Sequence, residues 1–161
     1  MFSKIDKTAY PPHIKPMLVW DGECGFCNYW ITHWKSKTQD RINYKSFQDV
    51  AEQFQDIPLI EFKKASRLIE ANGNVFSGPD SAYKSFTYFE NEDFRWHRWY
   101  SKYKWFTVLS DNAYNFIAKH RSFMFKITKL FFGKDPEAIK PYWFLHLLFA
   151  FSIFYVLVKY L

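Results

Sequence analysis

Residues 17–27 of the chain read MLVWDGECGFC. The apolar run Met17–Trp20 predicts a buried strand, and Asp21-Gly22 turns the chain out of that strand. Between Cys24 and Ser36 the apolar side chains recur at helical spacing, and lysines lie at the end of the segment, which predicts a helix. A strand, a tight turn and a helix that begins at a Cys-x-x-Cys pair form the first unit of an α/β fold.

The sequence after this helix predicts the rest of a small sheet with flanking helices. We expect a strand at 42–45, a short helix at 48–54, a strand at 66–71, a turn at Asn72-Gly73, a returning strand at 74–76 and a helix from 80 toward 89. This order predicts a thioredoxin-like α/β fold. It places Cys24 and Cys27 at the carboxyl end of the first strand, where α/β sheets usually carry their functional sites.

The C-terminal part of the chain is predicted to be helical. We expect helices at 95–110, from 110 or 111 through 121 and on to 132, and, after a break at Gly133–Pro136, at 142–161. A helix over this last, apolar segment would be about 30 Å long, enough to cross the hydrocarbon core of a membrane. We therefore expect a flexible arm at 1–16, a domain at 17–135 and a hydrophobic helix at 136–161 as membrane anchor.

The chain has two cysteines, Cys24 and Cys27. A bond between residues so close in sequence contributes little stability and exchanges easily, which favours chemistry over a structural role. At the first turn of a helix, unpaired backbone N–H groups and the helix dipole favour the thiolate of Cys24. We predict that Cys24 attacks a disulfide and Cys27 resolves the mixed disulfide, while Asp21 accepts a proton from Cys27 or tunes its pKa.

Other interpretations of the cysteines stay open. Both could be reduced thiols buried as small apolar side chains. A zinc site could use Cys24, Cys27 and His33, with a fourth ligand from His13 or His97. A hydrolase could pair a cysteine with His33 or His97. We expect no metal, because the chain has no second Cys-x-x-Cys, and no cofactor.

Composition points to a lipid or protein surface. Aromatic residues make up 23% of the chain, and the formal net charge is +6, which suits either anionic lipid or nucleic acid. Residues 94–106 are basic and aromatic and include no acidic residue. We expect this segment to pack on the core or to lie near a membrane, and expect no nucleic-acid partner, because no nucleic-acid motif accompanies it.

The hydrophobic segment 142–161 could instead be buried in the domain or in a partner. The spanning interpretation rests on the length of the segment and on interface anchors at its ends, Tyr142 and Trp143 at one and Tyr155, Lys159 and Tyr160 at the other. More lysines precede it than follow it, so the positive-inside rule places the redox domain on the cytoplasmic side. Residues 1–16 contain no apolar stretch, and we expect no secretory signal and a reducing environment for the cysteines.

Residues 21–28, DGECGFCN, resemble the Asp-x-x-Cys-x-x-Cys signature of the DCC family of predicted thiol-disulfide oxidoreductases. Residues 77–82 and 115–121, and the turn at 132–135, are similar to later segments of that family. The resemblance covers about 17–135 and implies a thioredoxin-like fold, with Cys24 and Cys27 as the redox pair and Asp21 as the motif aspartate. We also expect substrate contacts at Gly25, Phe26, Pro79 and Asp80.

These observations together predict an enzyme, a membrane-associated thiol-disulfide oxidoreductase that acts on a protein disulfide or thiol. Membrane lipid is an expected partner. An integral membrane protein is another, because DCC-like modules are also found linked to such proteins. The alternative is a non-catalytic accessory or scaffold subunit of a membrane protein complex.

Overall fold

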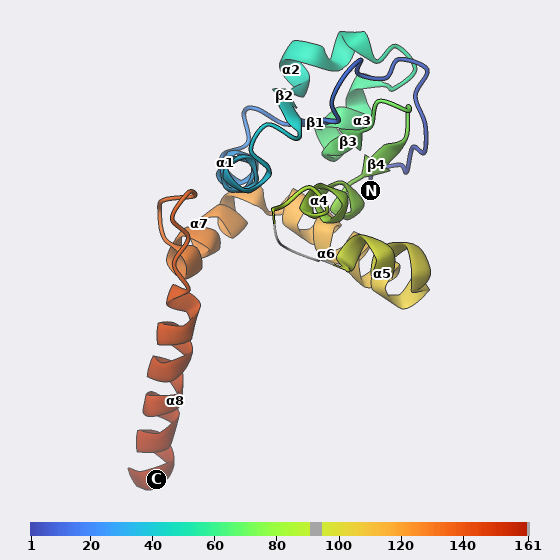
Figure 1. The fold of residues 1–161 in the computed structure, drawn as a ribbon. Coiled ribbons are helices and arrows are strands. Elements are labelled where there is room, and N and C mark those ends of the chain that lie inside the picture. Colours follow the sequence, from blue (N-terminus) through green and yellow to red (C-terminus); the bar gives the residue numbers. More distant parts are fainter. Residues whose placement is uncertain (91–94, 161) are drawn as a thin grey trace.

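A computed structural model describes residues 1–90 and 95–160 (Figure 1). In chain order its elements are β1 (Met17–Trp20), α1 (Gly25–Thr38), β2 (Asn43–Ser46), α2 (Phe47–Val50), η1 (Ala51–Gln53), α3 (Leu59–Lys64), β3 (Arg67–Ile69), β4 (Val75–Ser77), α4 (Pro79–Phe86), α5 (Trp96–Lys102), α6 (Lys104–Lys119), α7 (Arg121–Phe132) and α8 (Tyr142–Tyr160). The predicted order of strands and helices up to α4 is confirmed, apart from α3, a helix that was not predicted.

The described strands form one mixed sheet of four, in the order β2-β1-β3-β4. β1 pairs parallel with β2 and antiparallel with β3, and β3 pairs antiparallel with β4. Consequently β1, β2 and β4 run in the same direction, and their carboxyl ends lie at one edge of the sheet. This arrangement, with its flanking helices, confirms the predicted thioredoxin-like fold.

Both faces of the sheet are covered, which explains why β1 is apolar at successive positions. Met17 and Val19 belong to a core cluster with residues of α2 and α3, whereas Leu18 lies in a second cluster that includes Ile31 of α1. The alternation along β1 therefore directs neighbouring side chains to opposite faces. The strand is held from both sides, and the cysteines follow directly from its end.

The segment 1–16 differs from the flexible arm expected there. The Phe2 side chain is buried, and its ring lies against Gly78. The backbone N–H of Ser3 donates a hydrogen bond of 2.8 Å to the Glu61 carboxylate. These contacts join residues far apart in the sequence, and so no local pattern of prolines and lysines could reveal them. The start of the chain packs as part of the domain.

The helices after α4 also differ from the predicted boundaries. The helix expected at 95–110 is interrupted at Tyr103, which has an extended backbone (φ −111°, ψ 108°) and separates α5 from α6. The helix expected at 110–132 is interrupted at His120, between α6 and α7. Neither interruption has a glycine or proline to signal it, and so tertiary packing rather than local propensity sets these boundaries. Phe94, at the start of the predicted basic aromatic segment, lies outside the described residues.

α8 projects from the rest of the molecule (Figure 1). Its side chains are exposed wherever the structure describes them, and so the helix is not buried in the domain. Among the described residues it is the one helix long and apolar enough to cross a membrane, by length and composition. This feature weakly indicates membrane association.

Candidate redox site

The two cysteines lie at the start of α1 and are joined by a disulfide. Cys24 is the N-cap residue of the helix, and its Sγ accepts a hydrogen bond of 3.1 Å from the backbone N–H of Cys27. An N–H directed at this sulfur favours negative charge on it when the bond is reduced. Cys24 is buried, with 9% of its surface exposed, and Cys27 is partly exposed. The structure thus represents the oxidised pair, with Cys27 the more accessible residue.

Asp21 lies beside the pair and is held in place by its neighbours. Its backbone oxygen accepts a hydrogen bond from the N–H of Cys24 at 3.1 Å. One carboxylate oxygen accepts a hydrogen bond from Gln48 Nε2 at 3.0 Å, and the other lies 2.7 Å from Arg121 Nη1. The carboxylate charge beside the cysteines is therefore paired with a guanidinium from α7.

Helix α7 covers the start of α1. A Cβ atom added to Gly25 would lie 3.1 Å from the Phe125 ring, and so the first turn of α1 touches this side chain of α7. Further along, the Tyr29 hydroxyl donates a hydrogen bond of 3.0 Å to the carbonyl oxygen of Gly133. Burial and the charge of Asp135 raise the pKa of Tyr29 above its ordinary value. The contacts fix α7 against the cysteine-bearing helix.

The other predicted substrate contacts lie at two places. Phe26 is partly exposed between the cysteines, with its ring edge-on to Trp30. Pro79 begins α4 at the same sheet edge as the cysteines, but two strands away from β1, and it is buried. Asp80 Oδ1 lies 2.7 Å from His97 Nδ1 of α5. The structure therefore places Gly25 and Phe26 at the disulfide and Pro79 and Asp80 elsewhere along the edge.

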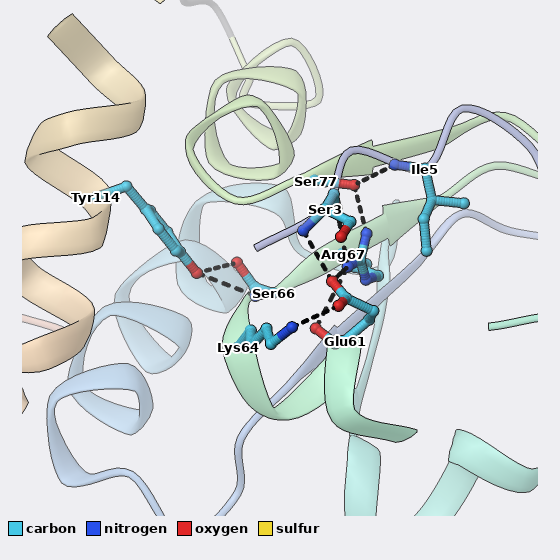
Figure 2. Close-up of polar contacts among 8 residues, drawn as sticks. All are labelled: Ser3, Ile5, Glu61, Lys64, Ser66, Arg67, Ser77 and Tyr114. Atoms are coloured by element: carbon cyan, nitrogen blue, oxygen red, sulfur yellow. Dashed lines mark hydrogen bonds and ion pairs between the residues drawn. The ribbon is translucent and has the colours of Figure 1, made fainter. Parts of the chain in front are cut away.

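A buried polar network supports the edge of the sheet near the cysteines (Figure 2). Arg67 pairs with Val19 across β1 and β3, and its side chain is fully buried. Its Nη2 lies 3.0 Å from Glu61 Oε2, and its Nη1 donates a hydrogen bond of 2.5 Å to the Ser77 hydroxyl. The neighbouring Ser66 donates its N–H to the hydroxyl of Tyr114 on α6 at 3.0 Å. The network joins α3, β3, β4 and the start of the chain.

The charges in this network stabilise each other. Burial opposes ionisation of Glu61, but hydrogen bonds from Lys64 and Ser3 and the charges of Lys64 and Arg67 outweigh it and hold the pKa of Glu61 below its ordinary value. Burial lowers the pKa of Arg67, and the Glu61 carboxylate opposes that effect. Arginine remains protonated at any physiological pH, and so the pair is ionic.

His33 and His97, the histidines considered for a zinc site or a hydrolase, contact other groups. Over residues 1–90 and 95–160, no three His, Cys, Asp or Glu side chains form a group that could hold a metal ion. His33 Nδ1 lies 3.0 Å from the carbonyl oxygen of Pro136, and His97 contacts Asp80.

Sequence reasoning did not find Arg121, Gln48 or Phe125 as neighbours of the redox pair. Arg121 is 100 residues from Asp21, and no spacing rule connects positions so far apart. Arg121 is the last residue of the segment 115–121, which resembles a later part of the DCC family. The resemblance did not assign a function to the Arg121 side chain. The guanidinium could be assigned only after the fold had brought α7 to α1.

Comparison with known protein families gives a match. The family model described as DCC1-like thiol-disulfide oxidoreductase matches residues 18–127, more than half of the chain. The matched range extends from β1 into α7, and so it includes both cysteines, Asp21 and Arg121. No curated protein and no solved structure matches the chain.

Proposed function

The chain belongs to the family of DCC1-like thiol-disulfide oxidoreductases, and from this premise we propose that it exchanges disulfides through Cys24 and Cys27 at a membrane surface. The observation that carries the proposal is the disulfide at the N-terminus of α1, with a backbone N–H directed at the Cys24 sulfur. The family and the Cys-x-x-Cys pair support redox chemistry, and α8 gives weaker support for the membrane.

The proposed reaction has two exchange steps. The Cys24 thiolate attacks one sulfur of a substrate disulfide, that bond breaks, and the released substrate thiolate takes up a proton. The Cys27 thiolate then attacks the Cys24 sulfur of the mixed disulfide and releases the second substrate thiol, which is also protonated. The pair loses two electrons and two protons, and the substrate gains them. The Cys24–Cys27 disulfide in the structure is the product state of the pair.

The neighbouring residues have proposed roles that follow from their positions. Asp21, oriented by Arg121 and Gln48, accepts the proton of Cys27 or adjusts its pKa. Gly25 and Phe26 contact the substrate, because they lie between the cysteines. Contact of Pro79 and Asp80 with the substrate stays a prediction, since these residues lie two strands from β1.

Membrane anchoring by α8 is the second part of the proposal. The helix is apolar, its described side chains are exposed, and lysines are more numerous before it than after it. By the positive-inside rule the redox domain then lies on the cytoplasmic side. The substrate is a protein disulfide or thiol at that surface, and an integral membrane protein is the proposed partner.

Mixed-disulfide trapping tests the roles of the cysteines. Reduced full-length Cys27→Ser protein is expected to accumulate a mixed disulfide with insulin, used as a general disulfide substrate, because the resolving thiol is missing. The Cys24→Ser protein is expected to accumulate none. The adducts are measured by mass spectrometry without reduction, and the double variant is the matched control.

The outcomes separate the alternatives. Accumulation only in the Cys24→Ser protein would reverse the two roles, in keeping with the greater exposure of Cys27. Absence of adducts in both single variants would contradict the oxidoreductase. The double variant can also be expressed in cells that lack the protein. If it corrected the defect of those cells as well as the natural chain does, the protein would act as a scaffold subunit rather than as an oxidoreductase.

A carbonate wash tests the anchor. The full-length chain is expected to stay in the membrane pellet at alkaline pH, whereas a chain that ends at Pro141 is released, because α8 supplies the apolar span. The two fractions are measured by immunoblot. Release of the full-length chain into the supernatant would contradict a spanning α8.

A further inference from the structure

Large apolar side chains are exposed on the helices between the redox domain and α8. Scattered exposed apolar residues are ordinary on protein surfaces, but a contiguous group of them marks a binding surface. On α6 and α7 the large apolar side chains that are more than half exposed are Trp105, Val108, Leu109, Phe116, Phe123 and Leu130. We name this group the α6–α7 apolar surface.

The α6 part of this surface follows the period of the helix. Trp105, Leu109 and Phe116 recur at spacings of four and seven residues, which places them on one side of α6. Other α6 side chains contact the domain: the Ser110 hydroxyl accepts a hydrogen bond from Tyr83, and the Tyr114 hydroxyl contacts Ser66. One side of α6 therefore packs on the domain, and the opposite side exposes apolar side chains to solvent. An ordinary amphipathic surface helix exposes its polar side instead.

The charges around this surface are almost all positive. From residue 104 to residue 134 the sequence contains a single acidic residue, Asp111, among the basic residues Lys104, Lys119, Arg121, Lys126, Lys129 and Lys134. Asp111 is only partly exposed, lies 2.8 Å from the Lys4 ammonium, and accepts a hydrogen bond from the Tyr100 hydroxyl. The remaining charge beside the apolar residues is thus positive.

The surface continues into α8. Figure 1 shows α5, α6 and α7 on the side of the sheet toward α8, and α2 and α3 on the opposite side. Where α7 meets α8, His146 Nε2 lies 3.2 Å from the carbonyl oxygen of Leu130, and the His146 and Phe131 rings are 5.8 Å apart. An apolar, basic surface therefore adjoins the first turns of the candidate membrane helix.

We propose that the α6–α7 apolar surface docks on the anionic headgroup layer of the membrane that α8 enters. Apolar side chains enter the boundary between headgroups and acyl chains, while Lys104, Lys119 and Lys126 bind the acidic headgroups. The inference rests on the proposed anchoring and is independent of the redox chemistry. A lipid surface fits better than a protein, because the surface combines positive charge with aromatic side chains and adjoins α8.

Docking has a consequence for the redox site. Phe123 is in the exposed surface, whereas Arg121 and Phe125 on the same helix contact Asp21 and Gly25. The helix that lies on the lipid is therefore the helix that covers the cysteines. In the docked state α7 alone separates the disulfide from the lipid, and so the pair is held near the headgroups.

Lysine footprinting tests the docking. The full-length chain is reconstituted in nanodiscs of phosphatidylcholine alone or of phosphatidylcholine with phosphatidylglycerol, and an impermeant amine reagent modifies exposed lysines. Modification of Lys104, Lys119 and Lys126 is expected to fall about fivefold in the anionic discs, because each lysine gains binding energy at an anionic surface. Lys45 on β2 is the internal control and is expected to react equally in both discs. High salt is expected to restore the reactivity of the α6–α7 lysines.

Two charge variants make the test specific. Leu109→Glu with Phe116→Glu introduces acidic groups into the surface at positions 58% and 54% exposed, and it is expected to restore lysine modification in anionic discs. Leu59→Glu with Ile60→Glu on α3, at positions 50% and 53% exposed, adds the same charge as the matched control and is expected to leave the protection intact.

Each outcome separates docking from the rest of the proposal. Equal modification in the two kinds of disc would overturn the docking, even if the carbonate wash had retained the chain in the membrane. Protection in native membranes but not in lipid discs would overturn lipid as the occupant in favour of a protein. The trapping experiment is unaffected by either result.

Discussion

Replacement of Glu61 by leucine is expected to lower the free energy of unfolding by about 3–5 kcal/mol, because it leaves a buried guanidinium without its carboxylate. Arg67 is fully buried, and its Nη2 lies 3.0 Å from Glu61 Oε2. The same change removes the acceptor for the Ser3 N–H. Chemical denaturation of the full-length protein in detergent, followed by circular dichroism, measures the loss.

Two variants identify the buried ion pair as the cause. Lys64→Met removes the other cation that contacts Glu61, but this lysine is exposed, and a loss below about 1 kcal/mol is expected. Glu61→Leu combined with Arg67→Met is expected to recover much of the stability, because no unpaired charge remains. Equal losses for Glu61→Leu and Lys64→Met would contradict this account.

The same pair adds a pH dependence to the stability. The pKa of Glu61 in the folded protein lies below its ordinary value, and so the folded state binds fewer protons than the unfolded state at acidic pH. The contribution is complete above the ordinary glutamate pKa, about 4.3, and is lost as the pH falls through the lower folded value. The Glu61→Leu protein is expected to lack this acid-dependent part.

Replacement of Gly78 by alanine is the second large effect, with an expected loss of about 2–5 kcal/mol in the free energy of unfolding. Gly78 has φ 60° and ψ −125°, a conformation that residues with a Cβ atom rarely adopt. An added Cβ would also lie 2.6 Å from Cζ of the buried Phe2 ring. Denaturation under the same conditions gives the change.

A double variant separates the two causes at Gly78. In a Phe2→Ala background the ring is absent, and Gly78→Ala is expected to cost less than in the natural chain, leaving mainly the backbone strain. A Gly78→Ala protein within about 0.5 kcal/mol of the natural chain would contradict both causes. The glycine also explains part of the segment 77–82 that resembles the DCC family: the turn there requires it, and Pro79 then begins α4.

The first half of the fold was predictable because its signals are local. The apolar run of β1, the Asp21-Gly22 turn and the helical spacing after Cys24 each lie within one element, and the turn at Asn72-Gly73 joins β3 to β4 as predicted. The position of the cysteines at the start of α1 followed from the same signals.

The surroundings of the pair were not predictable, because they depend on contacts distant in sequence. Arg121 reaches Asp21, and Phe2 reaches Gly78, only after the chain has folded. The breaks at Tyr103 and His120 depend in a similar way on how α5, α6 and α7 pack, and no residue at those positions forces them. Local patterns specified the redox motif, and the fold supplied the groups around it.

The connection from α7 to α8 limits where the cysteines can act. Tyr29 and His33, both on α1, contact the carbonyl oxygens of Gly133 and Pro136 at 3.0 Å, and so the helix that follows the cysteines and the segment leading to α8 are joined. A flexible linker between the domain and α8 would allow the disulfide to move over a wide range of distances from the bilayer. In the proposed anchored protein this short, fastened connection gives the disulfide a nearly constant height. The distance of a substrate disulfide from the bilayer would then decide whether it reacts, because a disulfide held farther from the bilayer cannot contact Cys24 and Cys27.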